Sequence, residues 1–200
     1  MIGKVKIRHL FLLAWLAALS TKAQVSSENY VQTTERISDT QVLSTTEYYD
    51  GLGRPFEMVE QKKTPDGANL IHLKEYDGLG RDWKTWLPVK DASDFLSISA
   101  ARSQGNNQYR DSHAFSLTEY DGSPLNRINT VEGVGAEWTS HPVKKDYLVN
   151  TSKYPLNCKY YRVSMQGQLQ DKGYYPEGRL YVTKTTDENG NESYEFKHIA

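Results

Sequence analysis

Two copies of one six-residue segment place an aspartate and an arginine at a fixed spacing. The segment Tyr-Asp-Gly-Leu-Gly-Arg occupies residues 49–54 and recurs unchanged at residues 76–81. An aspartate carboxylate can accept N–H bonds from residues further along and start a turn, and glycine adopts a positive φ without steric cost. An arginine four residues later can pair with that carboxylate or contact a neighbouring repeat. We favour these structural roles for Arg54 and Arg81 over the binding of acidic ligands.

Two altered copies extend the pattern. Residues 118–127 keep Tyr-Asp-Gly but have Ser123-Pro124 in the turn, and residues 186–191 keep the aspartate and an Asn-Gly dipeptide. Asn-Gly between runs of β-branched and aromatic residues is a strong hairpin signal, which we prefer to a calcium loop at Asp187. We assign a structural repeat-core role to Tyr49, Asp50, Gly53, Arg54, Tyr76, Asp77, Gly80, Arg81, Tyr120 and Asp121.

The elements that must position these turns are β-strands. Aromatic residues make up 12% of the chain, 14 of its 200 residues are tyrosine, and the runs beside each turn are rich in β-branched residues. This composition predicts a mainly all-β fold of successive antiparallel hairpins. Residues 90–109 look irregular. We expect Ser93 to cap a short helix through Ala101, and the Gly-Asn-Asn run at 105–107 to end it.

The N-terminus has the three parts of a secretory signal peptide. Basic residues at positions 4, 6 and 8 precede an apolar run over 10–19, and small residues at Thr21 and Ala23 offer a cleavage site. The run is shorter than the roughly 20 apolar residues that a membrane-spanning helix needs. We therefore expect cleavage of residues 1–23, a mature module of residues 24–200, and export to the periplasm, outer surface or extracellular space, with no stable membrane span.

The charge of the mature chain bears on its partners. The full chain has 24 basic and 25 acidic residues, and residues 1–23 hold four of the basic residues and no acidic one. The net charge therefore changes from −1 to −5 on cleavage. No basic footprint for nucleic acid is present, and an acidic chain is repelled by anionic membranes.

At the repeated segments the sequence resembles the YD-repeat, or RHS, proteins, whose repeats carry a Tyr-Asp-x-x-Gly-Arg core. Segments 48–55, 123–127 and 173–191 resemble the amino-terminal region of exported RHS-type proteins of the Bacteroidetes, and the likeness covers about residues 29–197. The resemblance implies a β-rich strip that continues into downstream RHS repeats. In the family such repeats form a hollow shell that can enclose a toxin, as in polymorphic toxins, or act at the cell surface.

The sequence departs from that pattern at its end. Relatives usually run on for many hundreds of residues, whereas this sequence stops at Ala200, without the family's cleavage signature or a toxin domain. We expect a truncated or fragmentary product. The leading hypothesis is a non-catalytic structural segment of an exported RHS protein, and the alternative is a stand-alone surface module that binds carbohydrate.

Evidence for catalytic or metal chemistry is weak. The histidines lie far apart, and neither a phosphate-binding loop nor a nucleophile elbow occurs, so we expect no enzyme activity, cofactor or metal site. Cys158 is the only cysteine, and we expect a buried thiol. Carbohydrate contacts, if present, would use Trp83, Trp86 and Trp138. Trp83 and Trp86 should point to opposite faces of one strand, so one of them should be core.

Overall fold

A computed structural model describes residues 28–39 and 41–198, so the expected signal peptide lies outside the described residues. The fold is mainly β, as the turn pattern predicts. The strands are β1 Asn29–Arg36, β2 Val42–Tyr49, β3 Pro55–Glu60, β4 Asn69–Tyr76, β5 Asp82–Trp86, β6 Val89–Asp91, β7 Phe115–Tyr120, β8 Ile128–Glu132, β9 Val143–Val149, β10 Lys159–Val163, β11 Leu169–Tyr174, β12 Leu180–Thr186 and β13 Glu192–His198. The helical elements are α2 Ile98–Tyr109 and the 3-10 helix η2 Ala136–Ser140.

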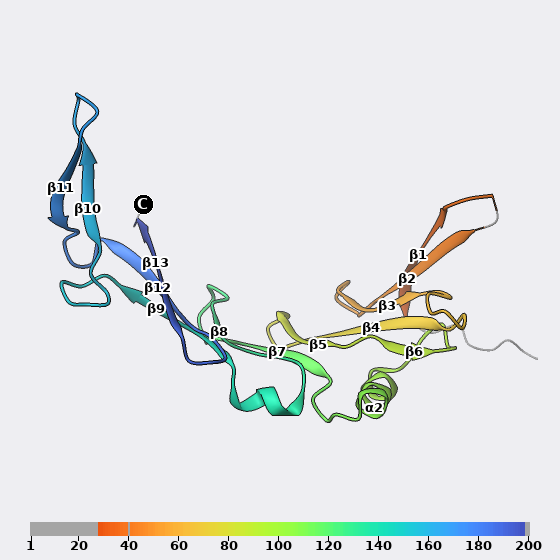
Figure 1. Ribbon diagram of the computed structural model, residues 1–200. Coiled ribbons are helices and arrows are strands. Elements are labelled where there is room, and N and C mark those ends of the chain that lie inside the picture. The colour runs from red at the N-terminus through yellow and green to blue at the C-terminus, as the bar shows by residue number, and fades with distance from the viewer. Residues whose placement is uncertain (1–27, 40, 199–200) are drawn as a thin grey trace, which may run out of the picture.

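Eleven strands form one antiparallel sheet, in the order β1-β2-β3-β4-β5-β7-β8-β9-β12-β13, with β6 paired to β4. Neighbours in the sheet are mostly neighbours in sequence, so the chain lays down one strand beside the last. The result is a long narrow strip rather than a compact sandwich (Figure 1). Strands β10 and β11 form a separate hairpin, which projects from the strip near its C-terminal end (Figure 1).

One strand of the strip is interrupted between Trp86 and Val89. Strand β5 pairs with β4 at Lys74–Thr85, and β6 pairs with the same strand at Ile71–Val89. Pro88 has no N–H to donate to a ladder, so the strand breaks there. The neighbouring Leu87 turns its N–H to the carbonyl of Ala114, 2.9 Å away, ahead of β7.

The core lies on one face of the N-terminal half of the strip. Its buried residues come from β2 to β7 and α2, and the side chains of Phe95 and Leu96, ahead of the helix, pack against it. A buried polar link joins the helix to the sheet. Glu75 of β4 accepts hydrogen bonds from Trp86 Nε1 at 2.7 Å and from Arg102 Nε at 2.8 Å, and it also pairs with Arg102 Nη2. Because Trp86 and Arg102 supply donors to the Glu75 carboxylate, they offset the free-energy cost of burying its charge.

The expected helix was wrong in its position and length. It begins after Ser97, whose hydroxyl accepts the N–H of Ala100, and it continues through Gly105 to Tyr109. A Cβ on Gly105 would lie only 3.3 Å from the Trp86 ring. Glycine therefore allows the helix to pack closely on the sheet, and this tertiary contact outweighs its low helix propensity. Among the described residues, no helix has the length and apolar character to cross a membrane.

Candidate functional site

The two identical segments form two nearly identical turns. In the first, Asp50 Oδ1 accepts the N–H groups of Leu52 and Arg54, each at 2.9 Å, and Oδ2 accepts Arg54 Nε at 2.8 Å. In the second, Asp77 makes the same three bonds to Leu79 and Arg81. These donors stabilise the ionised carboxylate, so the pKa of each aspartate lies below its ordinary value, chiefly through the backbone N–H of the arginine.

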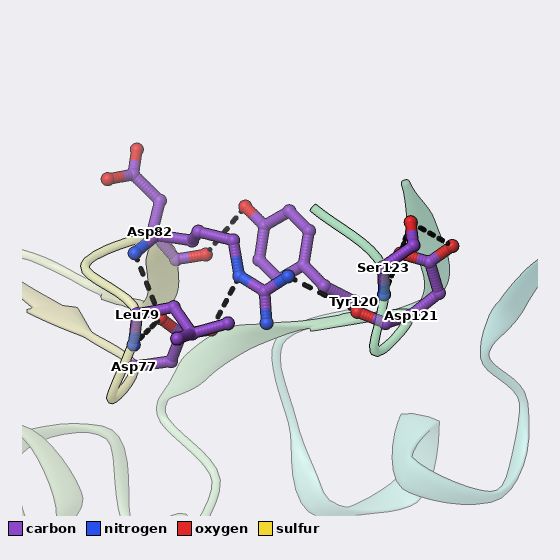
Figure 2. A network of polar contacts seen from close by, with 7 residues as sticks. Asp77, Leu79, Asp82, Tyr120, Asp121 and Ser123 are labelled. Atoms are coloured by element: carbon purple, nitrogen blue, oxygen red, sulfur yellow. Dashed lines mark hydrogen bonds and ion pairs between the residues drawn. The ribbon is translucent and has the colours of Figure 1, made fainter. Parts of the chain in front are cut away.

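The arginine of each turn also contacts the next hairpin. Arg54 stacks over the ring of Tyr76, with Cζ 4.5 Å from its centroid, and Arg81 stacks over Tyr120 at 4.4 Å. Each tyrosine hydroxyl donates to the backbone carbonyl that follows the arginine: Tyr76 to that of Pro55 at 2.7 Å, and Tyr120 to that of Asp82 at 2.9 Å. We call such an arginine–tyrosine contact between successive hairpins a rung. Figure 2 shows the rung between the second and third turns.

A β-bulge lies beside each of the first three turns. The strand register shifts at Tyr49, Tyr76 and Tyr120, and in each case the return strand carries one extra residue. A bulge bends the strand and redirects a side chain. The redirected residues are Phe56, Trp83 and Asn129 on the return strands, each beside a repeat tyrosine. Two of these tyrosines, Tyr76 and Tyr120, lie under the arginine of the preceding hairpin. Tyr49, at the first turn, instead donates its hydroxyl to Glu47 at 2.7 Å.

The third turn is longer and braced differently. Asp121 Oδ1 and Oδ2 accept the Ser123 hydroxyl, each at 2.8 Å, so serine takes the place that arginine occupies in the first two turns. Arg81 Nη1 reaches the Asp121 carbonyl at 3.2 Å (Figure 2). Arg127 still forms a rung, with Cζ 5.0 Å from the Tyr147 centroid, and the Tyr147 hydroxyl donates to the Ile128 carbonyl at 3.1 Å.

The fourth copy closes a hairpin but lies apart from the rungs. Asp187 accepts the N–H groups of Asn189 and Asn191, and Asn191 Nδ2 replaces the arginine side chain at 2.8 Å. Thr186, just before this turn, is opposite Lys144 at the start of β9, whereas Tyr147 and the third turn lie toward the other end of that strand. The fourth turn is therefore at the opposite edge of the strip and cannot extend the row of rungs.

The position that sequence reasoning missed is Asn150. Its Oδ1 accepts the N–H groups of Arg179 and Leu180 at 2.8 Å, and its carbonyl accepts the N–H of Gly178 at 3.0 Å. The bonds from Gly178 and Arg179 match those that Asp50 accepts from Gly53 and Arg54, while the bond from Leu180 has no counterpart there. Asn150 and residues 177–180 therefore form a turn of the repeat type that is split by residues 151–176, which include the β10–β11 hairpin. The only local signal is the Gly-Arg pair at 178–179, which is too short to recognise without the spatial match.

The structure does not bring the three tryptophans together. Trp86 is only 6% exposed and its Nε1 is bonded to Glu75, so this residue is the core member of the pair and has no free face for a sugar. Trp83, half-buried, is the extra residue of the bulge beside the second turn. Trp138 is 47% exposed in η2, at the opposite edge of the strip. A shared aromatic platform is therefore absent from this arrangement.

No group of three or more His, Cys, Asp or Glu side chains that could hold a metal ion occurs within residues 28–39 and 41–198. The thiol of Cys158 is half-buried rather than buried as expected, because the residue lies at the base of the projecting hairpin, outside the core.

The comparisons with known proteins bear on the first part of the chain. Residues 20–149 match the family described as Domain of unknown function (DUF6443), while no curated protein and no solved structure gives a significant match. The matched region contains the first three turns and the three rungs, and it ends one residue before Asn150, where the split turn begins. Since this match spans more than half of the sequence, the chain belongs to the DUF6443 family.

Proposed function

We propose that the chain is a non-catalytic structural segment of an exported RHS-type protein, and that its hairpins continue into downstream repeats of a β-shell. The observation that supports this most directly is the row of rungs. Each of three successive turns contributes an arginine to the tyrosine of the following hairpin. Such contacts serve to join one repeat to its neighbour, as in repeat proteins in which each unit completes the core of the next.

The outer strands of the strip support the same proposal. Every residue of β1 is exposed, and five of the seven residues of β13 are exposed. An unpaired strand edge presents free N–H and C=O groups to another strand. In the proposed shell, further repeats would pair with β13.

The test is the association of the chain in solution. We expect residues 24–200 to form assemblies larger than a monomer, measured by size-exclusion chromatography with light scattering. Ser193→Lys places a charge on the exposed β13 edge and should reduce association. Gln170→Lys, on the projecting hairpin, is the matched control and should not. A monomer whose β13 amides resist hydrogen exchange as strongly as those of β12 would overturn the proposal.

A further inference from the structure

The third rung differs from the first two because the guanidinium of its arginine, Arg127, does not donate to the aspartate of its own turn. Arg54 and Arg81 donate Nε and further N–H groups to the aspartate of their own turn. At the third turn Ser123 occupies the Asp121 carboxylate. Within the described residues, Arg127 therefore has its ring contact with Tyr147 and no hydrogen-bonding or ionic partner for its guanidinium. A half-buried guanidinium thus retains a full set of donors.

This guanidinium lines an open groove over β9 and β12. The groove has a volume of about 540 Å³, which lies within the roughly 300–1,000 Å³ typical of small-molecule sites. Its walls include Tyr147, Val149 and Tyr181, which share one face of the sheet because Tyr181 is opposite Val149 in the strand register. Tyr147 is 37% exposed and Tyr181 52% exposed, so both rings present surface to the groove.

The charges around the groove favour an anion. Lys197 is directly opposite Tyr181 on β13, so a second cation flanks the groove on the side away from Arg127. Glu195 is the acidic neighbour on the same face, and it is already paired with Lys197 at 3.2 Å. The planar guanidinium fork matches a carboxylate through two parallel hydrogen bonds. The aromatic rings would cover the body of a ligand whose carboxylate is held in this way.

We propose that the Arg127–Tyr147–Tyr181 groove binds a small ligand that carries a carboxylate on a ring-shaped body. Arg127 binds the carboxylate, Tyr181 packs against the ring, and the Tyr181 hydroxyl is available to donate to a ligand oxygen. Tyr147 holds the guanidinium in place, since its own hydroxyl is bonded to the Ile128 carbonyl. The ligand's ring could belong to a sugar acid or to an aromatic acid, and both present the same carboxylate chemistry. This site does not depend on the proposed structural function.

The test is a titration of the full chain with two carboxylates and their neutral counterparts. Glucuronate and benzoate are the probes, and glucose and benzyl alcohol are the controls. Binding is followed by calorimetry and by the NMR resonance of the Arg127 Nε–H group. We expect at least one carboxylate to bind saturably and to shift this resonance, and its neutral counterpart to do neither. The carboxylate that binds more tightly identifies the ring as sugar or aromatic.

Variants assign the binding to this groove. Arg127→Met should weaken the bound probe at least tenfold, and Tyr181→Ala, at an exposed position that should not affect folding, should weaken it severalfold. Arg162→Met removes an exposed cation of the projecting hairpin and is the matched control, which should leave binding unchanged. The proposal is overturned if neither carboxylate binds saturably, if glucose and benzyl alcohol bind equally well, or if the Tyr181→Ala and Arg162→Met variants bind alike.

Discussion

Replacing Glu57 by glutamine should remove a pH dependence that this buried carboxyl imposes on stability. Glu57 of β3 is only 2% exposed, beneath the segment that leads into α2. Its Oε1 accepts the N–H of Leu96 at 3.0 Å, and its Oε2 has no hydrogen-bonding partner among the residues that the structure describes. Burial raises the pKa of this carboxyl from its ordinary 4.5 to about 7, although the Leu96 bond opposes the rise. The folded chain therefore retains a proton that the unfolded chain releases.

The sign and size of the effect follow from this difference. Below about pH 4.5 both states are protonated and the folded state has its full stability. As the pH rises to 7 the unfolded state loses its proton first, so the free energy of unfolding falls. At about 1.4 kcal/mol per pH unit, the total loss is about 3 kcal/mol. Above pH 7 Glu57→Gln should be more stable than the natural chain by up to that amount, and near pH 4 the two should be similar.

Urea unfolding, followed by tryptophan fluorescence between pH 4 and 8.5, measures this difference. Glu60→Gln on the same strand is the control. The pKa of Glu60 is below its ordinary value because, although burial opposes it, hydrogen bonds with Lys63 and His72 stabilise the charge. The control should therefore keep the fall in stability between pH 4.5 and 7. Parallel curves for Glu57→Gln and the natural chain would refute the reasoning, since they would mean that the carboxyl ionises as it does in water.

Other perturbations test the turns, the rungs and export. Gly53 and Gly80 both have positive φ, but a Cβ on Gly80 would also lie 2.8 Å from Arg54 Nη1. In thermal melts Gly80→Ala should therefore destabilise more than Gly53→Ala, by about 1 kcal/mol, the size of a cation–π contact; equal losses would show that Arg54 moves aside freely. Tyr120→Phe removes the bond to the Asp82 carbonyl and should cost about 1 kcal/mol in urea unfolding, and a neutral result would mean that water replaces the bond. N-terminal sequencing of exported protein should begin at residue 24, and an intact Met1 would contradict the signal peptide.

Local turn chemistry could be predicted from the sequence because it depends on residues within one segment. The Tyr-Asp-Gly-Leu-Gly-Arg spacing indicated hairpins, and hairpins are what the chain forms at both copies. It also indicated two alternative partners for Arg54 and Arg81, and each arginine in fact has both its own aspartate and the next tyrosine.

Features that depend on distant contacts could not be predicted in the same way. The helix was expected to run from Ser93 through Ala101 and not to pass the Gly-Asn-Asn run at 105–107, but it continues through Gly105 because the missing Cβ admits Trp86. The split turn at Asn150 is completed by residues 177–180, and the intervening hairpin separates the two parts of the motif. The copy at 186–191 has a recognisable turn, but its place at the opposite edge follows from how many strands precede it. A local sequence motif identifies a turn, but it does not show at which edge of the sheet that turn lies.

The rungs matter most where burial specifies the register least. In the N-terminal half the core fixes each strand, because a slip by one residue would turn its apolar side chains to water. Beyond β7 this constraint weakens, and β8 and β9 pair directly at only Thr130–Lys144 and Val131–Val143. The third rung joins these two strands, since Arg127 stacks on Tyr147 and the tyrosine hydroxyl bonds the carbonyl of Ile128. A slip by one residue would break both contacts. The rung therefore supplies, through one arginine and one tyrosine, the register that packing supplies elsewhere in the strip.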